Sequence, residues 1–149
     1  MANQIKPKYF AKMREEAKPL LLALNDQGFE VKDNQQVFFL LLNDAPLGYI
    51  ALEKSNPTVL ELKRIFVSPL YRHQKVGHYL LKFLEITVKT KGFLGIMVFS
   101  PLEFCNYFAM NGFKNNDGEV VVIDGVQGLK MHKELVMPFH RKAKNRRPF

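Results

Sequence analysis

The stretch LKRIFVSPLYRHQKVGHYLL, residues 62–81, decides the fold of this chain. It is typical of a strand, a sharp break at Pro69, a basic loop and a helix. The loop holds four polar residues in a row, Arg72 to Lys75, and leads into Val76 and Gly77. The first amides of a helix lack intrahelical partners and the helix dipole is positive there, which favours phosphate groups. The joint therefore indicates either an anion site or a solvated basic loop.

Apolar periodicity predicts the elements on either side of this stretch. We expect, in chain order, a short strand at 5–7, a helix at 9–27 with a kink or break at Pro19, a hairpin of strands 36–42 and 47–53, a strand at 58–68, a helix at 76–91, a strand at 93–100, a helix opened by a capping box at 100–103 and closed at Gly112, and a strand pair around Asp124-Gly125. The strand–helix–strand unit over 58–100 requires a right-handed crossover between strands that are parallel if adjacent. The order predicts a mixed α/β (α+β) domain with one central sheet.

Length and composition are those of one globular domain. The 149 residues are long enough for a hydrophobic core, and 47% hydrophobic with 24% charged residues argues against disorder. The single cysteine, Cys105, excludes an internal disulfide. Neither a secretory signal pattern nor an apolar run long enough to span a bilayer is visible, so we expect a cytoplasmic protein without a membrane partner.

The net charge of +8 is unevenly placed along the chain. Residues 140–149, HRKAKNRRPF, hold five basic side chains and no acid, which leaves the rest of the chain with 17 basic and 14 acidic residues. We therefore divide the chain into a domain at 1–138 and a basic C-terminal tail at 139–149. The tail either binds a polyanion such as nucleic acid by counterion release or is a solvated end that aids solubility.

The chain resembles the GNAT superfamily of acyl-CoA-dependent N-acyltransferases over residues 5–136. The family signature is R/Q-x-x-G-x-G/A after a strand, within a longer pattern, V-x-P-x-Y-R-G-x-G-I-G-x-x-L-L. This sequence carries it as Val67, Pro69, Tyr71, Arg72, Lys75, Val76, Gly77, Leu80 and Leu81. The segments LGYIALE at 47–53 and LELKRIFVSP at 60–69, and Gly112-Phe113, follow in the family order. The resemblance implies a GNAT-like mixed sheet with a splayed parallel strand pair and helices on both faces.

The resemblance also implies acetyl-CoA as co-substrate. In the family the pantetheine arm pairs with the backbone of the strand before the loop, and the diphosphate rests on the loop amides. The implied cofactor-binding residues are Ile65, Phe66, Val67, Arg72, His73, Gln74, Lys75, Val76, Gly77 and His78. No metal is expected, because the four histidines form no i, i+4 pair with a carboxylate and have no cysteine partner.

Lys75 departs from the signature, because it stands at the first motif glycine. A lysine with positive φ costs about 1 kcal/mol, whereas its ammonium can help to neutralise phosphate. We predict a negative φ at Lys75 and a side chain directed toward the diphosphate.

Two residues are candidates for acid–base catalysis. Glu61 lies on the cofactor strand upstream of the loop and is the best candidate base; the alternative is a surface carboxylate paired with Lys63 or Arg64. Many family members place an acidic tyrosine four residues before the helix-ending glycine, where this chain has Phe108. Its neighbour Tyr107 is about 100° further round a helix, so it is either the general acid or an aromatic of the core or rim.

These residues predict an N-acyltransferase that moves an acetyl group from acetyl-CoA to a primary amine of an unidentified small molecule or protein. The alternative is a catalytically weak or inactive GNAT-fold binding protein, directed to nucleic acid or the ribosome by its basic tail. The sequence leaves both a monomer and a homodimer open.

Overall fold

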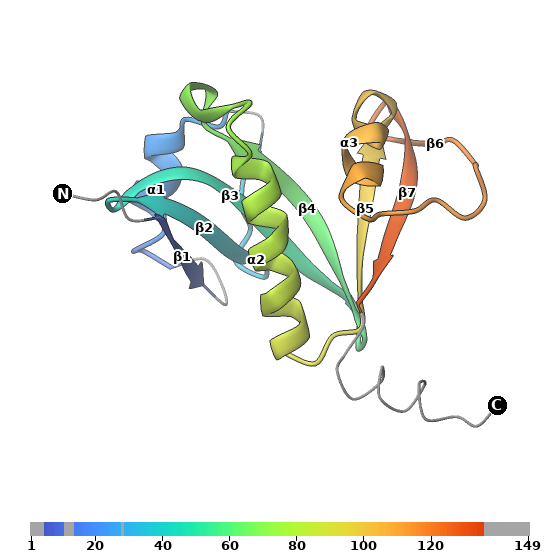
Figure 1. Ribbon diagram of the computed structural model, residues 1–149, viewed down its shortest axis with the longest axis horizontal. Coiled ribbons are helices and arrows are strands. Elements are labelled where there is room, and N and C mark those ends of the chain that lie inside the picture. Colours follow the sequence, from blue (N-terminus) through green and yellow to red (C-terminus); the bar gives the residue numbers. More distant parts are fainter. Residues whose placement is uncertain (1–4, 11–13, 28, 136–149) are drawn as a thin grey trace. The chain divides into compact units, whose positions relative to one another are not determined.

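The computed structural model describes residues 5–10, 14–27 and 29–135. Its seven strands follow the sheet order β1-β2-β3-β4-β5-β7-β6, and helices connect or cover them (Figure 1). The strands are β1 (Ile5–Phe10), β2 (Gln36–Leu42), β3 (Ala45–Asn56), β4 (Val59–Val67), β5 (Gly95–Pro101), β6 (Val121–Ile123) and β7 (Val126–Glu134). The helices are α1 (Lys18–Leu24), α2 (Val76–Thr90) and α3 (Cys105–Met110), with short 3-10 turns η1 (Pro69–Tyr71) and η2 (Leu102–Phe104).

This architecture confirms the predicted mixed α/β class with one parallel strand pair. The splay of that pair stays a prediction. The chain divides into two compact units. The first contains the residues up to Lys54 together with Glu61–Leu84, and the second contains Ser55–Leu60 and the residues from Glu85 onward. No helix within the described ranges is long and apolar enough to cross a membrane.

The predicted helix at 9–27 is wrong at its start. Tyr9 and Phe10 belong to β1, where they pair antiparallel with Phe38 and Val37 of β2. The ordered helix α1 begins only at Lys18, and Pro19 occupies its first turn, where the missing amide donor is harmless. Residues 11–13 lie outside the described part of the chain. The apolar spacing that suggested a helix is satisfied in β1 by pairing with a buried strand, which buries the Phe10 side chain.

The predicted capping box at 100–103 is also wrong. Pro101 is the last residue of β5, and the Ser100 hydroxyl donates to the Pro101 carbonyl oxygen at 2.9 Å instead of capping a helix. The chain then makes the 3-10 turn η2 before α3 begins at Cys105. Gly112, with φ of 91°, follows the helix as predicted.

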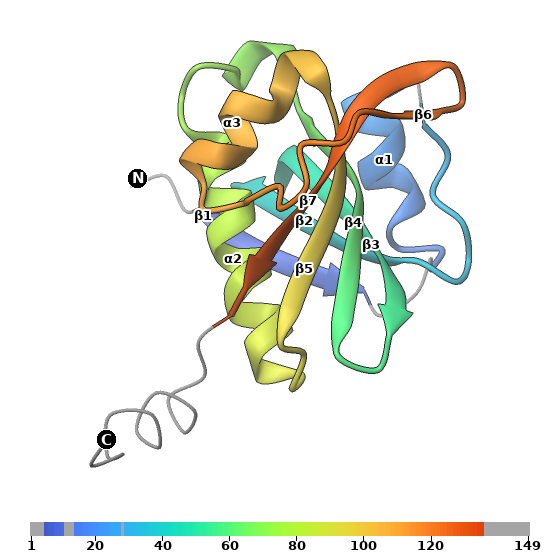
Figure 2. The same ribbon diagram turned by 90° about the vertical axis from the view of Figure 1, so that its right-hand side faces the viewer.

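In the first unit, helices cover both faces of the sheet. The odd-numbered residues of β2 belong to one core cluster with Leu24 of α1, whereas Phe38 stacks on Phe83 of α2 with ring centroids 6.0 Å apart. Side chains alternate across a strand, so the two helices lie on opposite faces, as Figure 2 shows. The two-sided cover explains the almost uninterrupted apolar sequence QVFFLLL of β2.

In the second unit, β5 and β6 flank β7 in antiparallel pairing. The turn between β6 and β7 consists of Asp124 and Gly125, both with positive φ, as a two-residue hairpin requires. Helix α3 packs beside β5 and β7 (Figure 1), and it contributes Phe108, which makes an edge contact with Phe113. The first two residues of β4, Val59 and Leu60, also belong to this unit. Just before them, the Thr58 carbonyl accepts from the Leu94 amide at 2.8 Å. The antiparallel pairing of β6 with β7 confirms the predicted strand pair around Asp124-Gly125.

Candidate functional site

The basic loop is built between two fixed points of the first unit. At the end of β4, the Ser68 amide donates to the Leu47 carbonyl of β3 at 2.8 Å, which anchors the chain before η1. Helix α2 begins where the Tyr79 amide donates to the Lys75 carbonyl at 3.0 Å. The amides of Val76 and Gly77 precede this bond, in the turn where no intrahelical carbonyl is available. The predicted strand, loop and helix N-terminus are confirmed, and the loop presents amides and cations together.

Two residues of the loop have left-handed backbone conformations. His73 has φ of 68° and Lys75 has φ of 65°. The predicted negative φ at Lys75 is therefore wrong: the lysine at the first motif glycine adopts a left-handed conformation that glycine would tolerate without strain. Each such residue costs about 1–2 kcal/mol relative to a right-handed one. Strain of this kind persists where the surrounding structure over-determines it, and it gathers at ligand sites.

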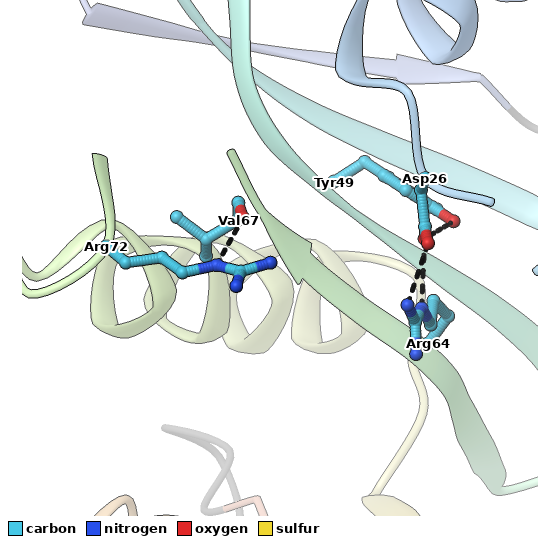
Figure 3. Close-up of polar contacts among 5 residues, drawn as sticks. All are labelled: Asp26, Tyr49, Arg64, Val67 and Arg72. Atoms are coloured by element: carbon cyan, nitrogen blue, oxygen red, sulfur yellow. Dashed lines mark hydrogen bonds and ion pairs between the residues drawn. The ribbon is translucent and has the colours of Figure 1, made fainter. Parts of the chain in front are cut away.

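Arg72 is folded back toward the end of β4. Its Nε donates to the Val67 carbonyl oxygen at 3.0 Å (Figure 3). Its guanidinium lies 5.4 Å from the ring centroid of Phe66. The side chains from Arg72 to Lys75 are exposed, and so is that of His78 in the first turn of α2. The loop therefore places side-chain cations beside the positive end of the α2 dipole, an arrangement that attracts anions.

Gly48 is a site residue that the sequence reasoning missed. A Cβ at this β3 position would lie 2.5 Å from the Phe66 carbonyl oxygen and 3.1 Å from a Leu80 methyl group. The backbone of the predicted cofactor strand thus approaches β3 too closely for any side chain. A glycine inside a strand pattern is the signal that pointed to this contact.

Glu61 is half-buried on β4, between the buried residues Leu60 and Leu62. Its carboxylate accepts from the Lys63 ammonium at 3.3 Å, and 23% of its side chain is exposed. A partly exposed pair of this type contributes at most about 1 kcal/mol and breaks readily. The ion pair of Glu61 with Lys63 is the surface pairing that the sequence offered as an alternative. The carboxylate is nevertheless accessible, so the role of Glu61 as base stays a prediction.

Tyr107 and Phe108 lie on α3, in the second unit. Phe108 is only 4% exposed and packs against Phe113, so the family position of the acidic tyrosine is filled by a core residue. Tyr107 is half-buried, and burial raises the pKa of its phenol above the ordinary value. A phenol that stays protonated at neutral pH can donate a proton, which keeps Tyr107 as the candidate acid.

A second polar group was not predicted from the sequence. The Asp26 carboxylate, only 5% exposed, accepts two hydrogen bonds from Arg64, at 2.8 and 3.0 Å, and one from the Tyr49 hydroxyl at 2.9 Å (Figure 3). Hydrogen bonding to Asp26 raises the pKa of the Arg64 guanidinium, and burial together with the same carboxylate raises that of the Tyr49 phenol. We call these three residues the Asp26 network.

Comparison with known proteins decides the family. The sequence model of the acetyltransferase (GNAT) domain matches residues 8–135. The chain belongs to the GNAT acetyltransferase family. Among curated proteins, Probable N-acetyltransferase 14 of Xenopus tropicalis is 46% identical to this chain over 56 residues. That stretch covers 37% of this chain and 27% of the Xenopus protein, so the chain matches only about a quarter of that relative.

Solved GNAT structures share the fold across most of this chain. Escherichia coli ElaA is 19% identical with a TM-score of 0.69, over 88% of this chain and 100% of its own. The PaiA N-acetyltransferase of Thermoplasma acidophilum, solved in complex with coenzyme A, is 20% identical with a TM-score of 0.64, over 90% of this chain and 99% of its own. At these identities the comparison establishes the fold.

The described residues do not test two other predictions, the basic tail and the absence of a metal. The basic tail at 139–149 lies outside the described residues. Within the described ranges, no three His, Cys, Asp or Glu side chains gather in a group that could hold a metal ion. Cys105 is half-buried, and its thiol points at the Ser100 and Pro101 carbonyl oxygens, at 3.7 and 3.5 Å.

Proposed function

We propose that this GNAT-family protein transfers an acetyl group from acetyl-CoA to a primary amine. The observation that carries the proposal is the loop from Arg72 to Lys75, which holds His73 and Lys75 in left-handed conformations directly before the start of α2. The coenzyme A complex of the Thermoplasma relative supports the same co-substrate here.

The proposed binding mode assigns one part of acetyl-CoA to each part of the loop region. The diphosphate lies against the amides at the start of α2 and the side chains of Arg72, His73 and Lys75. The pantetheine arm pairs with backbone groups of Ile65, Phe66 and Val67. In this mode Gly48 is needed because it lets β3 close against β4 behind the carbonyl of Phe66.

The proposed reaction is direct acyl transfer. The neutral amine nitrogen forms a bond to the thioester carbonyl carbon, and the carbon–sulfur bond then breaks. The nitrogen loses one proton and the sulfur gains one, so the products are an amide and free CoA thiol. Glu61 receives the amine proton, directly or through water, and Tyr107 donates a proton to the sulfur.

Calorimetric titration with acetyl-CoA and an acetyl-transfer assay on a panel of amines test the proposal. Binding should be saturable and should raise the melting temperature, because a ligand selective for the folded state stabilises it. The transfer rate should exceed acetyl-CoA hydrolysis for at least one amine. Absence of binding at millimolar acetyl-CoA would overturn the co-substrate assignment; binding without transfer to any amine favours the second candidate.

The second candidate is a GNAT-fold protein that binds CoA with little or no turnover. It is favoured by one specific observation, the burial of Phe108 where many family members place the acidic tyrosine. In this case Tyr107 is a rim aromatic, and replacing it by phenylalanine leaves CoA affinity and any residual transfer rate unchanged. The proposed setting for either candidate is the cytoplasm, with residues 139–149 available for nucleic acid or the ribosome.

A further inference from the structure

Phe66 is the centre of a chain of contacts between guanidinium groups and aromatic rings. The Arg72 guanidinium lies 5.4 Å from its ring centroid, and that of Arg64 lies 5.6 Å away. Arg64 in turn lies 6.0 Å from the ring centroid of Phe29. All of these residues belong to the first unit. This series of contacts thus connects Phe29, in the segment after α1, with Arg72, the first residue of the loop, through Arg64 and Phe66 of β4.

The ring of Phe66 is held independently of the loop. It is half-buried and packs against the core cluster that contains Phe10, Phe39 and Tyr49. The Tyr49 ring lies next to it, with centroids 6.2 Å apart. A ring seated in this way offers a fixed face to a cation, which electrostatic attraction to the π-system favours.

Arg64 is held at its other end. Its two hydrogen bonds to the buried Asp26 carboxylate fix the plane of the guanidinium, because a bidentate pair allows one orientation. Arg64, which precedes Phe66 on β4, therefore restrains the ring of Phe66 without involving the loop that follows β4. The Asp26 network and the core together hold the ring in place.

Arg72 has few other restraints. Its side chain is exposed, and within the described residues its contacts are the Nε bond to Val67 and the ring of Phe66. A free arginine side chain loses rotamer entropy when a ligand immobilises it. A side chain already held near its bound position loses less, so its ligand binds more tightly.

We propose that Phe66 is a positioning residue for Arg72: its ring, set by Arg64 and the Asp26 network, pre-orients the Arg72 guanidinium for the diphosphate of CoA. The proposal rests on the proposed function, since it assigns a role at the same site. It concerns the side chain of Phe66 and is separate from any pairing of its backbone with pantetheine.

The first test measures CoA affinity by calorimetry in Phe66→Leu and Phe66→Tyr variants. Loss of one exposed cation–π contact should weaken CoA binding by about two- to fivefold in Phe66→Leu, and tyrosine, which keeps the ring, should restore affinity. Phe83→Leu is the matched control, because it removes a half-buried ring that stacks on Phe38, away from both arginines. Where Phe66→Leu does not fold, Phe66→Met serves in its place, since methionine fills irregular core gaps.

The decisive test repeats Phe66→Leu in an Arg72→Ala background. If Phe66 acts through Arg72, the second substitution has no further effect on CoA affinity. An equal loss in both backgrounds, or failure of tyrosine to restore affinity, would overturn the positioning role. So would unchanged affinity in Phe66→Leu. If instead the unsubstituted protein does not bind CoA, the proposed function fails first, and the two failures are thereby distinguished.

Discussion

The Asp26 network and the loop from Arg72 to Lys75 both border β4, and they are built in opposite ways. In the network every charge is paired, and the carboxylate is almost completely buried. In the loop the side chains are exposed, and two residues hold left-handed backbone conformations that glycine would adopt without strain. The first region uses polar groups to stabilise the fold, whereas the second presents them to solvent and to ligands.

The difference indicates where selection for stability and selection for binding act. A buried, fully paired network loses stability when one member is removed, because its partners are left unpaired. A strained and exposed loop should gain stability when it is relaxed and lose ligand affinity when its charges are removed. Substitutions in the Asp26 network should therefore lower the free energy of unfolding, whereas substitutions in the loop should mainly change CoA affinity. The sign of each measured effect tests this contrast between the two regions.

The largest expected effect is on turnover. Glu61→Gln should reduce the acetyl-transfer rate by about 100-fold or more, because the variant cannot accept the amine proton. CoA affinity and melting temperature should stay nearly unchanged. Lys63→Gln is the control, because it removes the ion-pair partner of Glu61 and keeps the carboxylate; its rate should stay within about threefold of the parent rate. An undiminished rate in Glu61→Gln would return this residue to the surface-pair interpretation.

The next largest effect is on stability. Asp26→Asn should lower the free energy of unfolding by about 2 kcal/mol, because Arg64 and Tyr49 lose a charged acceptor in a buried place. The measurement is urea unfolding with an unchanged m-value. Asp33→Asn, at an exposed carboxylate, should change stability by less than about 0.5 kcal/mol. Equal effects of the two substitutions would show that the network does not stabilise the fold.

A smaller loss is expected from Tyr49→Phe, which removes only the hydroxyl that donates to Asp26. The free energy of unfolding should fall by about 1 kcal/mol. In a double-mutant cycle with Asp26→Asn the two losses should not add, because the bond they share is counted once. Strict additivity in the urea midpoints would mean that the hydroxyl and the carboxylate stabilise the fold independently.

The smallest effect separates strain from charge at Lys75. Lys75→Gly should raise the free energy of unfolding by about 0.5 kcal/mol, since relief of a left-handed residue exceeds the added flexibility of the unfolded chain. Lys75→Ala keeps the strain and should not be stabilised. Both variants lose the ammonium and should bind CoA about two- to fivefold more weakly at low salt, with a smaller difference at high salt. Tighter binding by the glycine variant would show that backbone freedom outweighs the charge.

The sequence alone determined the elements whose signals are local. The strand of 58–68, the basic loop and the helix from Val76 follow from apolar period, Pro69 and the helix-ending Gly92, and the structure has each of them. The hairpin turn at Asp124-Gly125 is equally local, because only a few residue types tolerate two successive positive φ values. The family signature combines several of these local signals in a fixed order, which is why the order and spacing of residues suffice to show the resemblance.

Only the tertiary structure decided features that depend on distant partners. Strand β1 replaced the start of the predicted helix because β2 offered an edge to pair with. Asp26 meets Arg64 across 38 residues of sequence, a separation that no local pattern encodes. At Lys75, the anchor of Ser68 to Leu47 and the start of α2 fix both ends of the loop. The path between these two points is set by the sheet and the helix, so the lysine adopts the left-handed conformation that its own side chain disfavours.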